Sequence, residues 1–277
     1  MDVRAAVVSL GGCAHTSSLL ALGVSESALT RAVRAGDVLR PRRGWYVSGA
    51  LSDPVTRAVR AGGRLTGISA IQQWGGWVLG PRPLHVSVPE NSARLRPTPG
   101  VILHWDARDV GERGTTSSVG MIDALARVVL DDAHESAVAA LDWALFSGNI
   151  EEADLPRIAA LVPHARRSTV CAADPLCESL PESLTRTRLR RSGHAVRSQV
   201  PLGSTRIDLV VDGRVGIETD GEEFHRDTFE RDRRKDIAMV RASYFPLRVP
   251  ARMVFYEWPV VLRAVDEALA WSPPRPR

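Results

Sequence analysis

Apolar and polar residues alternate along two segments in the last third of the chain, residues 206–211 and 215–220. The apolar positions are Ile207, Leu209 and Val211 in the first segment and Val215 and Ile217 in the second. A period of two is typical of a β-strand with one buried face. The sequence therefore predicts two half-buried strands on either side of the loop at residues 212–214.

The register of this hairpin follows from its apolar faces. Placing Leu209 opposite Ile217 leaves a three-residue loop and brings Asp208 directly opposite Glu218. A two-residue Asp-Gly turn would instead shift the register by one residue and separate the two carboxylates. The hydrophobic pattern favours the opposed arrangement.

The first 50 residues show helical spacing of apolar residues interrupted by glycines. Residues 16–22 predict a short helix that ends at Gly23, and a second helix follows in which Leu29 and Val33 face the core. Short apolar runs then flank an arginine-rich turn at residues 40–43. Three short helices and a hairpin fit this segment, and helix, tight turn, helix is the order of a common DNA-binding module.

Polar side chains on the second helix and on the turn are candidates for contact with duplex DNA. A recognition helix presents side chains to the major groove, and a wing places guanidinium groups near phosphates or the minor groove. The predicted DNA-binding residues are Thr30, Arg31 and Arg34 on the helix and Arg40, Arg42 and Arg43 on the turn. The alternative is a three-helix module with solvated arginines.

The middle of the chain combines strand-like and helical segments. Residues 84–88 and 101–105 are rich in strand formers, whereas residues 118–162 have helical spacing. Proline, arginine and small residues predict a linker at residues 163–175. The sequence therefore predicts a mixed and helical middle region, and it does not indicate the role of that region.

The charge balance favours a polyanionic partner. The chain has 36 basic and 32 acidic residues, a formal charge of +4 and a pI near 9.4; Lys235 is its only lysine. Cys13, Cys171 and Cys177 fit neither a paired zinc motif nor a disulfide framework. The sequence shows no secretory signal and no apolar run long enough for a membrane, so we expect a cytoplasmic protein without membrane contact.

The carboxylates of Asp208 and Glu218 predict a metal site. Opposed carboxylates repel each other unless a cation lies between them. Oxygen ligands without thiols suit Mg²⁺ or Mn²⁺, which can activate water and stabilise the charge on a scissile phosphate. Phosphodiester hydrolysis is the chemistry that this pair predicts, and two solvated surface carboxylates are the alternative.

A series of short motifs runs through the first 47 residues. It comprises Gly11-Gly12-Cys13-Ala14, residues 19–25, residues 32–36, Leu39-Arg40 and residues 42–47. The series resembles the winged helix of AbiEi-like antitoxins, and a weaker similarity continues to about Val162. The resemblance implies binding of double-stranded DNA, repression of a toxin operon and a cognate toxin as a further partner.

A second series of motifs occurs in order along residues 174–270. It comprises Cys177-Glu178-Ser179, residues 197–201, residues 206–213, residues 217–221, His225, residues 231–236 and residues 247–249. The series resembles the very-short-patch-repair-like endonucleases of the PD-(D/E)xK superfamily. The resemblance implies a restriction-endonuclease-like α/β domain with a central mixed sheet, DNA as substrate and Mg²⁺ or Mn²⁺ as cofactor.

This resemblance assigns roles to individual residues. Asp208 and Glu218 would bind the metal, and Glu182 would complete or orient the site, although Glu182 also fits a capping box at the start of a helix. Asp220 stands where the superfamily has its lysine, so the lysine that would orient the water is missing from that position. His225 would then act as general base or as a donor to the phosphate, with a structural histidine as the alternative.

Two charged runs have competing interpretations. A basic stretch on the preceding predicted helix could contact the DNA backbone; it consists of Arg186, Arg188, Arg190 and Arg191. Residues 231–236 alternate in charge, which is typical of a solvated helix face and also compatible with a place beside the site.

The sequence thus predicts an α/β protein, of the α+β multidomain kind, in three parts. These are a winged helix-turn-helix domain at residues 1–50, a mixed α/β and helical middle region of AbiEi-like type at residues 51–162, and an endonuclease-like domain at residues 174–270. The leading hypothesis is a Mg²⁺-dependent DNA endonuclease in phage defence, a toxin–antitoxin system or DNA repair. The alternatives are an antitoxin-like transcriptional regulator with an inactive nuclease fold and a toxin-neutralising protein that binds no DNA. The sequence leaves the oligomeric state open.

Overall fold

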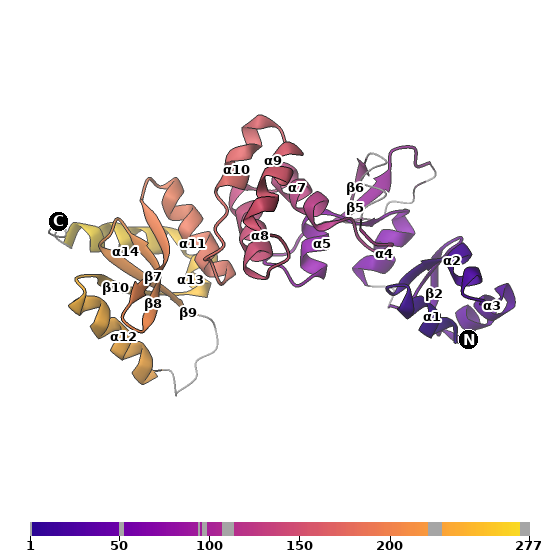
Figure 1. Cartoon of the computed structure of the whole chain (residues 1–277), viewed down its shortest axis with the longest axis horizontal. Coiled ribbons are helices and arrows are strands. Elements are labelled where there is room, and N and C mark those ends of the chain that lie inside the picture. Colours follow the sequence, from indigo (N-terminus) through magenta and orange to yellow (C-terminus); the bar gives the residue numbers. More distant parts are fainter. Residues whose placement is uncertain are drawn as a thin grey trace. The chain divides into compact units, whose positions relative to one another are not determined.

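A computed structural model describes residues 2–49, 53–93, 95, 99–106, 114–220 and 229–271 of the chain, apart from the side chains of Asp220, Phe229 and Arg231. The chain divides into two compact units, whose elements are labelled in Figure 1. The first unit comprises Met1–Asp132 and Ala153–Arg167, and the second comprises Ala133–Glu152 and Ser168–Arg277. In the described part of the chain, every helix is too short or too polar to pass through a lipid bilayer.

The first 49 residues form three helices and a small antiparallel sheet with strand order β1-β3-β2. The elements are α1 (Val3–Ser9), β1 (Cys13–His15), α2 (Thr16–Ala21), α3 (Glu26–Ala35), β2 (Leu39–Arg42) and β3 (Trp45–Val47). The predicted three helices and hairpin are present, and β1 is an additional strand. Their shared core includes Val7, Leu19, Leu29 and Val38.

Capping residues set the bounds of α3. The side chain of Ser25 accepts a hydrogen bond from Ala28 N at 3.2 Å, which satisfies one free N–H of the first turn. At the other end Gly36 adopts φ 79°, a left-handed conformation that costs glycine little. Gly23, with φ 83°, likewise ends the turn after α2. The tight turn between α2 and α3 therefore depends on glycine.

The remainder of the first unit contains a three-stranded mixed sheet with order β4-β5-β6. Strands β5 (Leu84–Pro89) and β6 (Val101–Asp106) are parallel, which confirms the two predicted strands, and β4 (Arg64–Leu65) is antiparallel to β5. The helices are α4 (Pro54–Ala61), α5 (Gly67–Gln73), α7 (Met121–Asp131) and α9 (Leu155–Ala160), with 3-10 turns η1 (Glu152–Asp154) and η2 (His164–Arg166).

The second unit is built on a four-stranded mixed sheet with order β10-β9-β8-β7. Its strands are β7 (Val196–Leu202), β8 (Thr205–Val211), β9 (Val215–Asp220) and β10 (Phe245–Pro250), of which β9 and β10 are parallel. Its helices are α8 (His134–Phe146), α11 (Leu180–Arg191), α12 (Phe229–Arg241), α13 (Ala251–Tyr256) and α14 (Trp258–Trp271). The segment predicted to be a linker contains η2 and α10 (Arg167–Cys171).

The hairpin of β8 and β9 has the predicted register. Leu209 pairs with Ile217 and Val211 pairs with Val215, so three residues form the loop. The expectation of half-buried strands is wrong, however, because α12 covers the other face. A Cβ added to Gly216 would lie 2.9 Å from the sulfur of Met239, a buried residue of α12. The absence of a side chain at Gly216 lets the helix approach the sheet closely.

A fully buried ion pair joins α8 to α11 inside the second unit. Arg186 Nη2 lies 2.8 Å from Asp142 Oδ2, and both side chains are 0% exposed. Ser183 Oγ donates to the same oxygen at 2.5 Å, and Asp174 N donates to Oδ1 at 2.7 Å. Helix α8 therefore packs against α11 within the second unit, whereas the sequence places its residues in the middle region.

Three of the four arginines of α11 bind the protein itself, and the predicted contact with the DNA backbone is wrong for Arg186, which is fully buried. Arg186 is buried, Arg188 donates to both carboxylate oxygens of Glu135, and Arg190 donates to the Val196 carbonyl at 2.9 Å. Helical spacing of charge could not reveal this, because α11 packs against neighbours on most of its surface.

We predict that Arg186→Met lowers the free energy of unfolding by about 3–5 kcal/mol, because it leaves Asp142 buried without its counter-charge. Urea unfolding of the full chain measures the change. Arg191→Met, at the exposed end of the same helix, is the matched control and should change stability by less than about 0.5 kcal/mol. Equal effects of the two substitutions would contradict this role for the ion pair.

Candidate functional site

Asp208 and Glu218 lie side by side where the ladder between β8 and β9 ends. The last backbone pair is Leu209 with Ile217. Beyond it each carboxylate accepts a hydrogen bond from the other strand: Asp208 N donates to Glu218 Oε1 at 3.3 Å, and Thr219 N donates to Asp208 Oδ2 at 3.0 Å. The predicted opposition of the two carboxylates is confirmed.

Lys235 brings a positive charge to this carboxylate pair from α12. Its ammonium group donates a hydrogen bond to Glu218 Oε2 and lies 3.7 Å from Asp208 Oδ1. Met239, four residues later, is fully buried against the sheet, and a spacing of four places both side chains on one face of the helix. We call Asp208, Glu218 and Lys235 the carboxylate–lysine cluster.

The electrostatics of the cluster favour a further cation. Burial raises the pKa of Glu218 to about 7, repulsion from Asp208 adds to the rise, and Lys235 opposes it. Glu218 is only 6% exposed, so water screens its charge weakly. Two carboxylates with one ammonium group leave a net negative charge, and their oxygens are the donors that Mg²⁺ and Mn²⁺ prefer. The residues therefore fit a divalent cation of this kind.

A polar hollow of about 880 Å³ opens beside the cluster. Arg248 on its wall neighbours Glu218 in the register of β10 with β9. Its guanidinium donates to Asp236 Oδ1 and to the Asp232 carbonyl, each at 3.0 Å. Arg248 thus holds α12 in the position that presents Lys235. The other residues of the wall include Glu178, Gln199, Thr205, Arg206 and Arg234.

Glu182 lies at the start of α11 and has a structural role. Its carboxylate accepts hydrogen bonds from Ser179 Oγ at 2.8 Å, Glu178 N at 3.0 Å and Gln199 Nε2 at 3.1 Å. Burial raises its pKa, and Asp208 contributes to the rise. Glu182 is therefore a helix cap whose charge is felt at the carboxylate–lysine cluster.

The structure does not locate two of the predicted site residues completely. Asp220 ends β9 and pairs with Pro250, but its side chain lies outside the described residues. His225 also lies outside them. Sequence reasoning missed Lys235, and the available signal was its position four residues before an apolar methionine in an otherwise charged run.

The predicted DNA-binding residues lie on α3 and on the β2–β3 hairpin. Five of them are exposed: Thr30, Arg31, Arg34, Arg40 and Arg43. Arg42 differs from the expectation of a free wing residue. A Cβ added to Gly62 would lie 1.8 Å from Arg42 Nη1, so this guanidinium packs against the end of α4.

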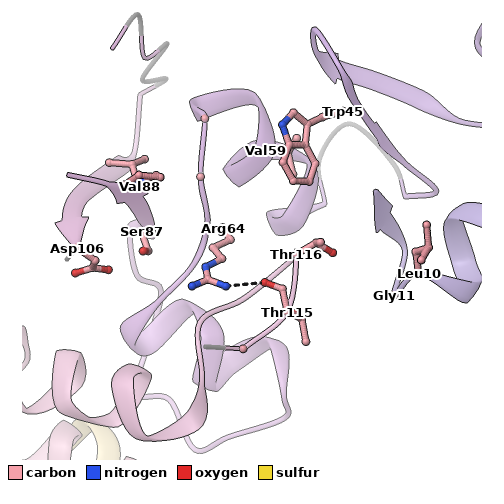
Figure 2. Close-up of a pocket in the computed structure, with 14 residues that line it drawn as sticks. Leu10, Gly11, Trp45, Val59, Arg64, Ser87, Val88, Asp106, Thr115 and Thr116 are labelled. Atoms are coloured by element: carbon pink, nitrogen blue, oxygen red, sulfur yellow. Dashed lines mark hydrogen bonds between the residues drawn. The ribbon is translucent and has the colours of Figure 1, made fainter. Parts of the chain in front are cut away.

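The first unit contains a second hollow of about 630 Å³. Figure 2 shows Trp45 and Arg64 on its wall, where Arg64 Nη1 donates to the Thr115 carbonyl at 2.8 Å. Asp106, the acidic residue among those that line it, is bound by Arg127 at 2.9 Å. Among the described residues that line it, this mostly apolar hollow therefore offers no pair of carboxylates comparable to the cluster in the second unit.

Comparison with known proteins gives a family match for the N-terminal segment. Residues 1–49 match the family described as transcriptional regulator, AbiEi antitoxin. A search of curated proteins gives no match. The family match supports DNA binding and a toxin–antitoxin setting, with a toxin as a candidate partner. Residues 1–49 are thus similar to AbiEi antitoxin regulators, and the second unit of the same chain holds the carboxylate–lysine cluster.

Proposed function

We propose that this protein is a DNA-binding, Mg²⁺-dependent endonuclease of the PD-(D/E)xK type. The observation that carries the proposal is the meeting of Lys235 from α12 with the carboxylates of Asp208 and Glu218. The resemblance places an aspartate at the position of the superfamily's lysine, and Lys235 supplies the missing charge from another element. Two carboxylates and one lysine, the groups of the PD-(D/E)xK motif, are then present together at a polar hollow.

Asp208 and Glu218 would hold the divalent cation. When bound, Mg²⁺ lowers the pKa of a coordinated water and stabilises negative charge on a phosphate. The hydrogen bonds from Thr219 N to Asp208 and from Asp208 N to Glu218 fix the orientation of both carboxylates. Their burial and mutual repulsion favour a cation in the site.

Lys235 would act on the phosphate or on the attacking water. Its ammonium group has three N–H donors, and one of them reaches Glu218. A fixed positive charge in a partly buried site stabilises the developing negative charge without reorganisation. Glu182 and Gln199 are positioning residues beside the cluster, and by resemblance Asp220 completes the acidic set and His225 serves as general base or phosphate donor.

The N-terminal segment would deliver this site to duplex DNA as a winged helix. Helix α2, the turn at Gly23 and α3 have the order of a helix-turn-helix, and the β2–β3 hairpin corresponds to the wing. Exposed Arg31 and Arg34 on α3 suit the major groove, and Arg40 and Arg43 suit phosphates or a minor groove. Arg42 is assigned to the contact with Gly62.

A regulator without cleavage activity is the second candidate, and the family match at residues 1–49 favours it. In that case the carboxylate–lysine cluster would be a structural ion pair, and the protein would repress an operon and bind a cognate toxin. Cleavage of DNA distinguishes the two functions.

We expect purified protein to cleave supercoiled plasmid with Mg²⁺ or Mn²⁺. Asp208→Asn, Glu218→Gln and Lys235→Met should each reduce the rate at least about 100-fold, because each removes a group that stabilises the transition state. Glu267→Gln, at an exposed position on α14, is the matched control and should retain the rate.

Plasmid that stays bound and uncut with both metals, including mismatched and nicked substrates, would reject the endonuclease in favour of the regulator. Cleavage that persists in all three site variants would show a contaminating nuclease and would likewise reject the assignment.

Arg40→Ala and Arg43→Ala should weaken binding to duplex DNA and flatten its salt dependence. Each lost phosphate contact lowers the slope of log K against log salt by about 0.9. Arg157→Ala removes the same charge from an exposed position on α9 and should leave the slope unchanged. If fluorescence anisotropy gave the same slope of log K against log salt for all three variants, the DNA would bind at a surface other than the N-terminal segment.

A further inference from the structure

Two histidines of the first unit meet on neighbouring strands. His85 lies on β5 and His104 on β6, and the parallel register pairs Ser87 with His104. His85 is two residues before Ser87, so both imidazoles are on one face of the sheet. Their ring nitrogens, Nδ1 of His85 and Nε2 of His104, are 3.1 Å apart.

Asp131 completes this group from the end of α7. Its Oδ2 lies 3.6 Å from His104 Nδ1 and 3.9 Å from His85 Nδ1. These separations are too long for hydrogen bonds between the carboxylate and either ring. Three potential ligand atoms from three elements therefore converge within 4.8 Å of one another.

The two imidazoles lie largely buried in the first unit. Gly67 leaves room for the Arg127 side chain beside this group, since a Cβ there would lie 2.9 Å from Arg127 Cγ. The His85 and His104 side chains are 9% and 10% exposed. Burial lowers the pKa of both rings, and the charge of Arg127 adds to this. Asp131 raises the pKa of both rings, and Asp132 raises that of His85.

The acidic side of the group also favours a cation. Asp131 and Asp132 follow each other at the C-terminal end of α7, where the helix dipole disfavours negative charge. Asp131 Oδ1 lies 3.7 Å from Arg127 Nη1, which leaves Oδ2 directed to the histidines. Asp132 Oδ1 is 3.4 Å from Arg82, whereas its Oδ2 is buried with no hydrogen-bond partner among the described residues.

We propose that His85, His104 and Asp131 bind one Zn²⁺ ion. Zinc bonds of about 2.0–2.1 Å in a tetrahedral site place ligand atoms about 3.4 Å apart. Asp131 Oδ2 lies 3.6 Å from His104 Nδ1 and 3.9 Å from His85 Nδ1, and one ligand atom from each of the three residues lies within 4.8 Å of the others. Two imidazoles and a carboxylate select zinc and its neighbours over Mg²⁺. The fourth position would be taken by water, and the ion would fasten α7 to β5 and β6.

The test uses the full chain with Asp208→Asn and Glu218→Gln, so that the proposed nuclease site does not contribute. Isothermal titration with Zn²⁺, and the visible absorption of added Co²⁺, report on the site directly. The ligand variants are His104→Ala and Asp131→Asn, the latter at a side chain that is 27% exposed. His164→Ala, at an exposed histidine of η2, is the matched control.

We expect one equivalent of Zn²⁺ to bind, tetrahedral Co²⁺ bands to appear and the thermal midpoint to rise with metal. Both ligand variants should weaken binding at least about 100-fold, and His164→Ala should bind as the parent does. Thermal melting in the presence of chelator shows whether the His104→Ala variant is folded. If that variant is unfolded, the Zn²⁺ affinity of the Asp131→Asn variant tests the proposal. Failure of the parent to bind micromolar Zn²⁺, or equal binding by the ligand variants and the control, would overturn the proposal.

Discussion

Two carboxylates of like charge, held close together on neighbouring strands and largely removed from water, impose the constraint around which the second unit is arranged. The end of the β8–β9 ladder turns the backbone N–H groups of Asp208 and Thr219 toward these carboxylates. Helix α12 then places Lys235 against them. Burial raises the pKa of Glu218 to about 7, and repulsion from Asp208 adds to the rise. This arrangement supports the divalent cation that we propose.

The helices support that arrangement from outside the cluster. Arg248 of β10 holds α12 through Asp236 and the Asp232 carbonyl, and Gly216 lets α12 approach the sheet. On α11, the buried pair of Arg186 with Asp142 fixes the helix against α8. The fixed start of α11 sets the position of Glu182 beside Asp208. Several charged groups thus stabilise elements that carry the site and do not touch DNA or metal themselves.

The sequence predicted the hairpin and its paired carboxylates well, because strict alternation of apolar residues determines the register. It missed Lys235, since alternating charges in residues 231–236 are also typical of a solvated helix face. It assigned the arginines of α11 to DNA because the acidic partner of Arg186 lies 44 residues away on α8. The strands that carry His85 and His104 were predicted, but their meeting depends on a parallel register that local periodicity does not define.

The chain's single lysine allows a direct test of the central claim, that Lys235 shares its site with a divalent cation. Lysine labelled with ¹³C at Cε gives one side-chain signal, that of Lys235. Addition of Mg²⁺ should shift this signal in the intact protein and should leave it unchanged in the Asp208→Asn variant. A signal that does not respond to saturating Mg²⁺ in the intact protein would contradict the claim and leave the cluster a structural ion pair.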